Sequence, residues 1–235
     1  MRHKSPAIKM AKWITAAVLA STACHGSVAQ AAKDAYPKMA PLEQYLMEDR
    51  NAEIALAKSA APDVIARDAT VLVLGHHGYE TAVEGKNGFV CLVERGWTAQ
   101  SSDPNFWNPK LRGPICYNAT AAHTYLNRNL KRTDLVLAGS NKEQMFQAIY
   151  AAIASKELPP VESGSMSYML SKLSYLGDGN GHWHPHLMFF FDYMDPNAWG
   201  ANQKGSPIFA FDDKVEHVTT FLVPVMEWSD GTADH

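Results

Sequence analysis

The chain has 235 residues and a formal net charge of −3, from 21 Lys and Arg against 24 Asp and Glu. Residues 1–31 hold four of the basic side chains and no acidic one, so the rest has 17 basic and 24 acidic side chains, a formal charge of −7. Nucleic-acid binding depends on a surplus of Lys and Arg, which this balance excludes, and the length fits one domain of ordinary size.

The first 31 residues have the pattern of a secretory signal peptide. Four basic residues are followed by an apolar stretch from Trp13 to Ala23 and by small residues around Ala29. This stretch is shorter than the roughly 20 residues that a membrane-spanning helix needs. We therefore predict a signal peptide at 1–31, a single domain at 32–235 without a transmembrane segment, and a periplasmic or secreted location. Lipidation at Cys24 is the alternative.

The first half of this domain is predicted to hold one helix and three strands. The helix covers residues 42–60, with a break near 49–51, and ends before Pro62. The strands cover residues 70–74, 79–84 and 89–94, which are rich in β-branched and apolar residues. Because Asn87-Gly88 is a strong turn signal, we expect the three strands to form a meander.

The second half is predicted to hold a helical pair and further strands. Residues 101–118, rich in Pro and aromatic residues, are expected to form an irregular loop. Helices follow at 121–137 and 142–153, the second capped by Asn141 with Gln144. Strands are expected at 165–170, 184–193, 208–211 and 218–228, and a frayed tail at 229–235. The expected fold class is α+β, mainly antiparallel sheet with an N-terminal helix and a central helical pair, in a single domain.

Two cysteines, Cys91 and Cys116, remain after the signal peptide. A pair of cysteines in an oxidising compartment tends to be joined, and such a bridge would add about 3 kcal/mol through the unfolded state. Two separate buried thiols are the alternative, and the spacing does not decide between them.

The most informative segment is His182-Trp183-His184-Pro185-His186, which opens the apolar run Leu187–Phe191. Alternate residues of a strand share a face, roughly 6.5–7 Å apart, so two of these imidazoles can converge on one metal ion. We predict a divalent metal site, for zinc, iron or copper, at His182, His184 and His186, with His182 dependent on a bend. The further ligands remain open among His76, His77, His123, His217, Asp192, Asp195, Glu80, Glu84 and Glu94.

Two functions are consistent with this segment. A metal-bound water would make the protein a metal-dependent hydrolase, with a nearby carboxylate as base. Alternatively, the imidazoles bond to backbone or water, and the protein is a non-enzymatic envelope protein that binds a small molecule or a protein partner. No serine-hydrolase elbow and no nucleotide-binding glycine loop occurs in the sequence, so no catalytic nucleophile can be named.

The segment His182–Pro185, with Asp192 and Asp195 downstream, resembles the metal motif of the JAMM/MPN zinc isopeptidases. The resemblance implies that His182, His184 and Asp195 bind zinc and that Glu84 or Glu94 is the general base. This sequence has Asp192 where the family has serine. It also continues from the histidines into an apparent strand, where the family has a loop and a helix.

Nearly all of the chain after residue 31 is similar to exported bacterial proteins of unknown function. The likeness is carried by Ala69–Gly75 and by the His182–His186 segment. It implies a shared fold and an export route, and it brings no activity with it.

Overall fold

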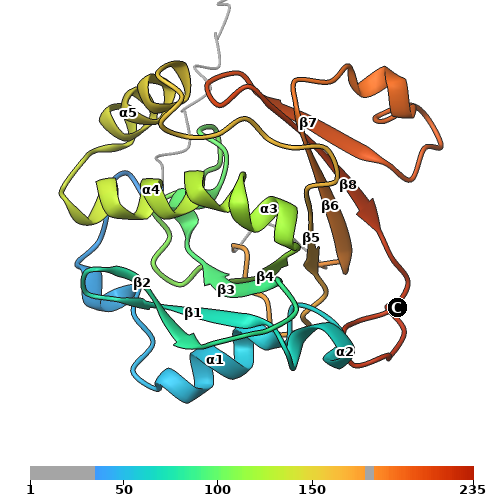
Figure 1. The fold of residues 1–235 in the computed structure, drawn as a ribbon, viewed down its shortest axis with the longest axis horizontal. Coiled ribbons are helices and arrows are strands. Elements are labelled where there is room, and N and C mark those ends of the chain that lie inside the picture. Colours follow the sequence, from blue (N-terminus) through green and yellow to red (C-terminus); the bar gives the residue numbers. More distant parts are fainter. Residues whose placement is uncertain (1–34, 178–182) are drawn as a thin grey trace, which may run out of the picture. The chain divides into compact units, whose positions relative to one another are not determined.

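The computed structural model describes residues 35–177 and 183–235 (Figure 1). The strands among them are β1 (Thr70–Gly75), β2 (Gly78–Val83), β3 (Val90–Glu94), β4 (Gly113–Tyr117), β5 (Met166–Met169), β6 (His186–Asp192), β7 (Phe209–Asp213) and β8 (Val218–Pro224). The α-helices are α1 (Arg50–Lys58), α2 (Asp63–Ala66), α3 (Ala119–His123), α4 (Leu126–Leu137) and α5 (Lys142–Ala154). Short 3-10 helices lie at Leu42–Gln44, Gly96–Thr98 and Pro196–Trp199.

The strands form one sheet in the order β2-β1-β3-β4-β5-β6-β8-β7. All neighbouring pairs among the described strands are antiparallel except β1 and β3. Residues 35–177 and 183–235 form one compact unit. The predicted α+β fold, with a mainly antiparallel sheet in a single domain, is confirmed.

The predicted meander of the first three strands is wrong, because β3 lies beside β1 and runs parallel to it. The connection after β2 wraps around the start of β1 instead of closing a hairpin: the amides of Lys86 and Asn87 both donate to the Asp68 carbonyl. Gly85 permits this close approach, since a Cβ there would lie 2.1 Å from the Thr70 nitrogen. The Asn-Gly signal marks a turn correctly but does not determine which strand comes next.

The prediction of an irregular loop at 101–118 is wrong for the last part of this segment, which forms the central strand β4. β4 is buried along its whole length and pairs with β3 over five positions. Its Pro114 argued against a central strand, because proline cannot donate to a ladder. The structure accommodates this proline because β5 pairs only with Cys116 and Tyr117 at the far end of β4.

The two faces of the central strands pack against different helices (Figure 1). Cys91, Val93 and Cys116 pack with alanines of α1 and α2 in one core cluster. Leu92 and Ile115, which alternate with them, pack with residues of α3 and α4 in another. Cys91 and Cys116 are directly paired across β3 and β4 and joined by a disulfide on the α1 face.

The predicted helix at 42–60 is wrong in its first part, where only the 3-10 helix Leu42–Gln44 forms, and the predicted helix at 121–137 is divided into α3 and α4. Local signals nevertheless placed two helix starts well. Asp49 caps α1 by accepting from the amides of Asn51 and Ala52, at the predicted break. The predicted capping box of Asn141 and Gln144 at the start of α5 is confirmed. Gly139, with φ +90°, permits the tight turn between α4 and α5.

The tail at 229–235 is held to the sheet, contrary to the prediction that it frays. The Ser229 amide donates to the Leu170 carbonyl over 2.9 Å, and the Asp234 amide donates to the Met226 carbonyl over 2.8 Å. Asp234 in turn reaches the ring of His184. The polar composition of the tail suggested a free end because two of its partners, Leu170 and His184, lie far away in the sequence.

None of the helices among residues 35–177 and 183–235 is long and apolar enough to cross a membrane.

Candidate functional site

A cavity of about 320 Å³ lies on the α4 face of the sheet. Strands β3 to β6 and β8, helix α4 and the segment after β3 all contribute to its wall. Much of the lining is apolar, from Leu111, Tyr125, Met169, Met188, Phe190, Val218 and Leu222. Small-molecule sites typically combine such walls with a few polar groups.

Glu94 is the polar group that strand alternation places in this wall. It follows Leu92 by two residues on β3, so both point away from the disulfide. Glu94 keeps some accessible surface because it faces the cavity, while protein atoms enclose the carboxyl elsewhere. This burial raises the pKa of Glu94 above its usual range, although the neighbouring hydrogen-bond donors act in the opposite direction.

Two neutral side chains hold one oxygen of this carboxyl. The Tyr117 hydroxyl donates to Glu94 Oε1 over 2.5 Å, and Asn129 Nδ2 donates to the same oxygen over 2.7 Å. Asn129 Nδ2 also donates to the Tyr117 hydroxyl over 2.9 Å. The Thr98 side chain is a third hydrogen-bond partner of this carboxyl. Glu94 is therefore built as an acid–base group with a defined orientation.

Burial also raises the pKa of Tyr117 well above its ordinary value, and the adjacent Glu94 adds to this effect. Tyr117 therefore stays a neutral donor toward the carboxyl. Beyond it, the ring of Tyr125 stacks on Phe190 with centroids 3.9 Å apart, forming an aromatic part of the wall.

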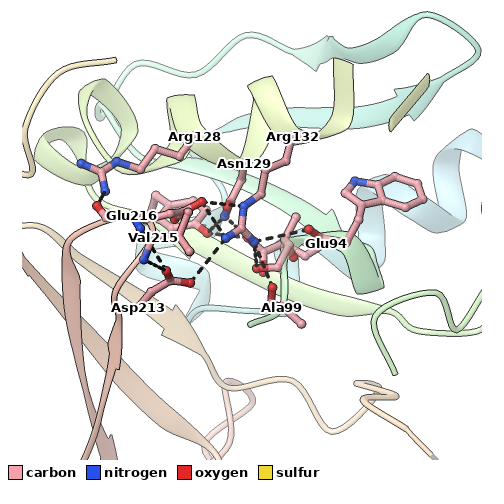
Figure 2. Close-up of polar contacts among 11 residues, drawn as sticks. Glu94, Ala99, Arg128, Asn129, Arg132, Asp213, Val215 and Glu216 are labelled. Carbon is pink, nitrogen blue, oxygen red and sulfur yellow. Dashed lines mark hydrogen bonds and ion pairs between the residues drawn. The ribbon is translucent and has the colours of Figure 1, made fainter. Parts of the chain in front are cut away.

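Arg132 lines the same cavity, but its guanidinium is already bound by protein oxygens. Its Nε donates to Glu216 Oε1 over 2.7 Å, and one terminal nitrogen donates to the carbonyls of Thr98 and Ala99 over 2.7 and 3.0 Å. The other terminal nitrogen is 2.6 Å from Glu216 and 3.8 Å from Asp213. Figure 2 shows Arg132 pointing from α4 into this ring of oxygens.

The cluster around Arg132 fixes the cavity's shape. Burial alone would lower the pKa of Arg132, but Glu216, Tyr125 and Asp213 outweigh it, and the pKa is raised. Arg128, one turn earlier on α4, donates to the Glu216 carbonyl over 2.6 Å (Figure 2). The permanently charged arginine thus ties α4 to the segment after β3 and to the turn before β8.

His186 is the predicted ligand that the structure brings into this site. It is 2% exposed, lines the cavity, and packs edge-on against Trp183 with ring centroids 4.5 Å apart. Burial lowers the pKa of His186 to about 4 despite the contact with the His184 carbonyl, so the ring is neutral at pH 7. Nδ1 lies 3.0 Å from that carbonyl and must donate to it, which leaves Nε2 as the acceptor.

His184 is placed differently from His186. Its side chain is 59% exposed, and its Nδ1 lies 2.6 Å from Asp234 Oδ2. His182, the third predicted ligand, lies outside the described residues. Among residues 35–177 and 183–235, no group of three or more His, Cys, Asp or Glu side chains is arranged to hold a metal. Because His182 lies outside these residues, the metal site stays a prediction.

The other candidate ligands lie away from the cavity, apart from Glu94. His76 and His77 are exposed in the turn between β1 and β2, and His123 is exposed at the end of α3. Glu80 forms an exposed ion pair with Arg50, and the ring of His217 lies beside that of Tyr150.

The ligand set implied by the isopeptidase resemblance is not brought together at His184. Asp192 ends the seven-residue strand β6, and Asp195 follows it as the cap of a 3-10 helix. A strand of this length spans roughly 20 Å, so these carboxylates and His184 lie at opposite ends of it. Glu84 is exposed after β2.

Two polar atoms of residues that line the cavity have no hydrogen-bond partner among residues 35–177 and 183–235. Asn129 Oδ1 is an acceptor on a side chain that is 2% exposed, and Trp183 Nε1 is a buried donor. Leaving a buried polar atom unpaired costs about 1–3 kcal/mol, so such atoms call for an explanation. A ligand that accepts a hydrogen bond from Trp183 Nε1 and donates one to Asn129 Oδ1 would recover this free energy.

Sequence reasoning named Glu94 and His186 but missed Tyr117, Asn129, Arg132 and Trp183 as site residues. A signal was present in α4, where Asn129 and Arg132 lie on the same buried helix face as Leu126 and Val136. Polar residues at apolar positions of an amphipathic helix mark either a buried network or a site.

Two larger hollows lack this chemistry. One of about 730 Å³ lies between residues 36–39, the 101–107 segment and the start of α5, and one of about 700 Å³ runs along α5. Their charged residues include the exposed Lys38 and Glu143. The candidate functional site is therefore the cavity on the α4 face that is lined by Glu94, Asn129, Trp183 and His186. We call it the Glu94 cavity.

The chain matches no family model, no curated protein and no solved structure.

Proposed function

We propose that this protein is exported to the periplasm or the exterior and binds a small molecule in the Glu94 cavity. The observation that carries the proposal is the convergence, in one largely apolar cavity, of an oriented carboxyl with two unpartnered polar atoms. Export is supported by the signal-like residues 1–31 and by the Cys91–Cys116 disulfide, a bond typical of oxidising compartments.

The cavity is suited to a ligand rather than to a structural role alone. Its volume of about 320 Å³ matches the lower range of small-molecule pockets. A core without a ligand would be more stable if the unpartnered Asn129 Oδ1 and Trp183 Nε1 were replaced by apolar atoms. Their presence supports recognition of a molecule that carries both a donor and an acceptor.

Glu94 gives this cavity acid–base capability. Its raised pKa keeps the protonated form available at higher pH than for an exposed glutamate. Toward a bound molecule, Glu94 can donate a hydrogen bond or a proton when protonated and accept one when ionised. Tyr117 and Asn129 hold the carboxyl in position in both states.

The second candidate function is a metal-dependent hydrolase at the predicted histidine site. One observation favours it: His186 is neutral, and its Nδ1 is held by a backbone carbonyl, the state in which an imidazole binds zinc, iron or copper. Glu94 in the same cavity wall would then be the carboxylate near a metal-bound water.

The proposal is tested by nuclear magnetic resonance on the protein without residues 1–31. The indole N–H signal of Trp183 is assigned with Trp183→Phe, and that of Trp199, which packs outside the cavity on Phe221, with Trp199→Phe. A panel of small fragments carrying both donors and acceptors is then added. We expect the binding fragments to shift the Trp183 signal and leave Trp199 in place. A panel that shifts neither signal would refute small-molecule binding at this cavity.

A further inference from the structure

The charges around the Glu94 cavity point to the class of molecule it binds. Four carboxylates line it, from Glu94, Asp103, Asp213 and Glu216, against the two guanidinium groups of Arg95 and Arg132, so its formal charge with all groups ionised is −2. Because charged walls in a low-dielectric cleft concentrate ions of the opposite sign, this lining favours a cation and disfavours an anion.

The two arginines do not change this conclusion, since their donors are already occupied. Arg95 is bound to the carbonyls of Tyr45 and Val93 and to Glu53. Arg132 is bound to Glu216 and to backbone oxygens, as Figure 2 shows. An anionic ligand would have to break buried ion pairs to reach either guanidinium, and breaking such pairs is strongly destabilising.

Glu94, by contrast, has only neutral hydrogen-bond donors. Among the described residues no Lys, Arg or His nitrogen lies within ion-pair distance of its carboxyl. Buried charges in proteins are normally paired. The charge of Arg132 lowers the pKa of Glu94, but Arg132 forms its ion pairs with Glu216 and Asp213, so among the described residues an ionised Glu94 has no counter-ion in direct contact.

The neighbouring groups complete a binding site for a cation. Asn129 Oδ1 is a buried acceptor without a hydrogen-bond partner among the described residues, on a side chain that also donates to Glu94, so a second acceptor lies close to the carboxyl. The rings of Tyr117, Tyr125 and Phe190 line the same cavity and pack on one another, with centroids 3.9 to 6.0 Å apart. Aromatic rings with a carboxylate are the usual surroundings of an organic ammonium group.

We propose that the ligand of the Glu94 cavity is a small organic ammonium ion, with one protonated amine on an apolar body. The Glu94 carboxylate and Asn129 Oδ1 hold the ammonium group, and the apolar walls hold the body. Trp183 Nε1 donates to a hydroxyl, ether or carbonyl oxygen where the body carries one. This inference rests on the proposed small-molecule function of the same cavity.

Three probes of matched size test the charge preference in the unaltered protein: 2-phenylethylamine, 2-phenylethanol and phenylacetate. Binding is followed through the Trp183 indole signal. We expect the amine to bind at least tenfold more tightly than the alcohol, and phenylacetate to cause no shift. Glu94→Gln keeps the hydrogen-bonding shape and removes the charge, so it should weaken the amine at least tenfold and leave the alcohol nearly unchanged. Glu43→Gln, an exposed glutamate in Leu42–Gln44, is the matched control.

The outcomes separate the two proposals. If the alcohol or phenylacetate binds as tightly as the amine, the ammonium class is overturned while the cavity remains a binding site. The ammonium class is also overturned if Glu94→Gln leaves the affinity for the amine unchanged. If none of the three probes shifts the Trp183 signal at millimolar concentration, the ammonium proposal fails. The small-molecule function itself fails only if no fragment of the panel shifts the Trp183 signal either.

Discussion

The Tyr117 hydroxyl donates a hydrogen bond of 2.5 Å to Oε1 of Glu94, although the two residues lie at opposite ends of the β3–β4 pair. Glu94 is paired with Gly113, and Tyr117 with Val90, so the tyrosine ring reaches along the sheet to the carboxyl. Gly113 has no side chain, and the side chains of Leu176 and Met169 fill this space, since a Cβ there would lie 3.4 Å and 3.5 Å from their ends. The contact therefore orients the acid and borders the cavity at the same time.

Tyr117→Phe should raise the pKa of Glu94 further, because it removes a hydrogen bond that favours the ionised carboxyl. The variant should also lose about 1 kcal/mol of unfolding free energy, as expected for one buried hydrogen bond. The pKa of Glu94 is measured from the chemical shift of its carboxyl carbon, followed against pH. Tyr150→Phe, at an exposed tyrosine, is the control and should change neither. An unchanged or lower titration midpoint in Tyr117→Phe would contradict the role assigned to the hydroxyl.

Glu94→Gln should be more stable relative to the wild-type protein at pH 8 than at pH 4. The folded-state pKa of Glu94 is raised, so the native protein binds the proton more tightly than the unfolded chain. The stabilisation from this proton is fully present below the unfolded pKa and is lost as pH rises through the folded pKa. Glutamine carries no charge at any of these pH values and removes that dependence. Guanidinium unfolding at both pH values measures the difference, with Glu43→Gln as the control; equal differences at the two pH values would refute the assignment.

Arg132→Met should lose about 3–5 kcal/mol of unfolding free energy, because it leaves the buried carboxylate of Glu216 without its partner. Arg67→Met is a matched control. Arg67 forms only an exposed contact of 3.8 Å with Asp63, whose loss should cost between about 0 and 1 kcal/mol. Equilibrium denaturation compares the two variants with the wild-type protein. Similar losses for both would show that the cluster around Arg132 does not hold the segments together.

Reduction of Cys91–Cys116 should lower the unfolding free energy by about 3 kcal/mol, since the bond restricts the unfolded chain. Both cysteines are fully buried, so we expect the reductant to act only when the protein unfolds. Denaturation with and without dithiothreitol measures the loss. The double variant Cys91→Ala, Cys116→Ala should be insensitive to the reductant, and an equal response in both proteins would contradict the assignment.

The predicted metal site at His182, His184 and His186 calls for elemental analysis of the protein without residues 1–31, purified without a histidine tag. After incubation with zinc, iron or copper and removal of excess metal, we expect about one ion per chain. The double variant His184→Ala, His186→Ala should lose it. Absence of stoichiometric metal from the wild-type protein would end the metal-dependent alternative and leave small-molecule binding as the function of the cavity.

Features that depend on neighbouring residues were predictable from the sequence. The caps at Asp49 and Asn141 follow from side chains that satisfy amides within the next three residues. The period of two places His186, Met188 and Phe190 on one face of β6, and all three line the cavity. The polarity of the chain and the spacing of its apolar residues were also enough to predict an α+β domain.

Other predictions failed where distant partners decide the structure. β4 looked like part of a loop because Pro114 and its short length weaken the strand signal, but pairing with β3 supplies the stabilisation. β3 lies beside β1 because the connection after β2 binds around Asp68, which no periodicity shows. The tail at 229–235 is ordered by partners in residues 170 and 184.

The sequence alone determined the fold class, the capping box of Asn141 with Gln144 and the break near Asp49. Only the tertiary structure decided that Glu94, Tyr117, Asn129 and Trp183 meet in one cavity, and that His184 and His186 have different surroundings. Side-chain alternation fixes which face a residue takes, because it depends on the local backbone. Strand order and the packing of α4 depend on contacts between residues far apart in the chain, and these determine which polar groups share a site.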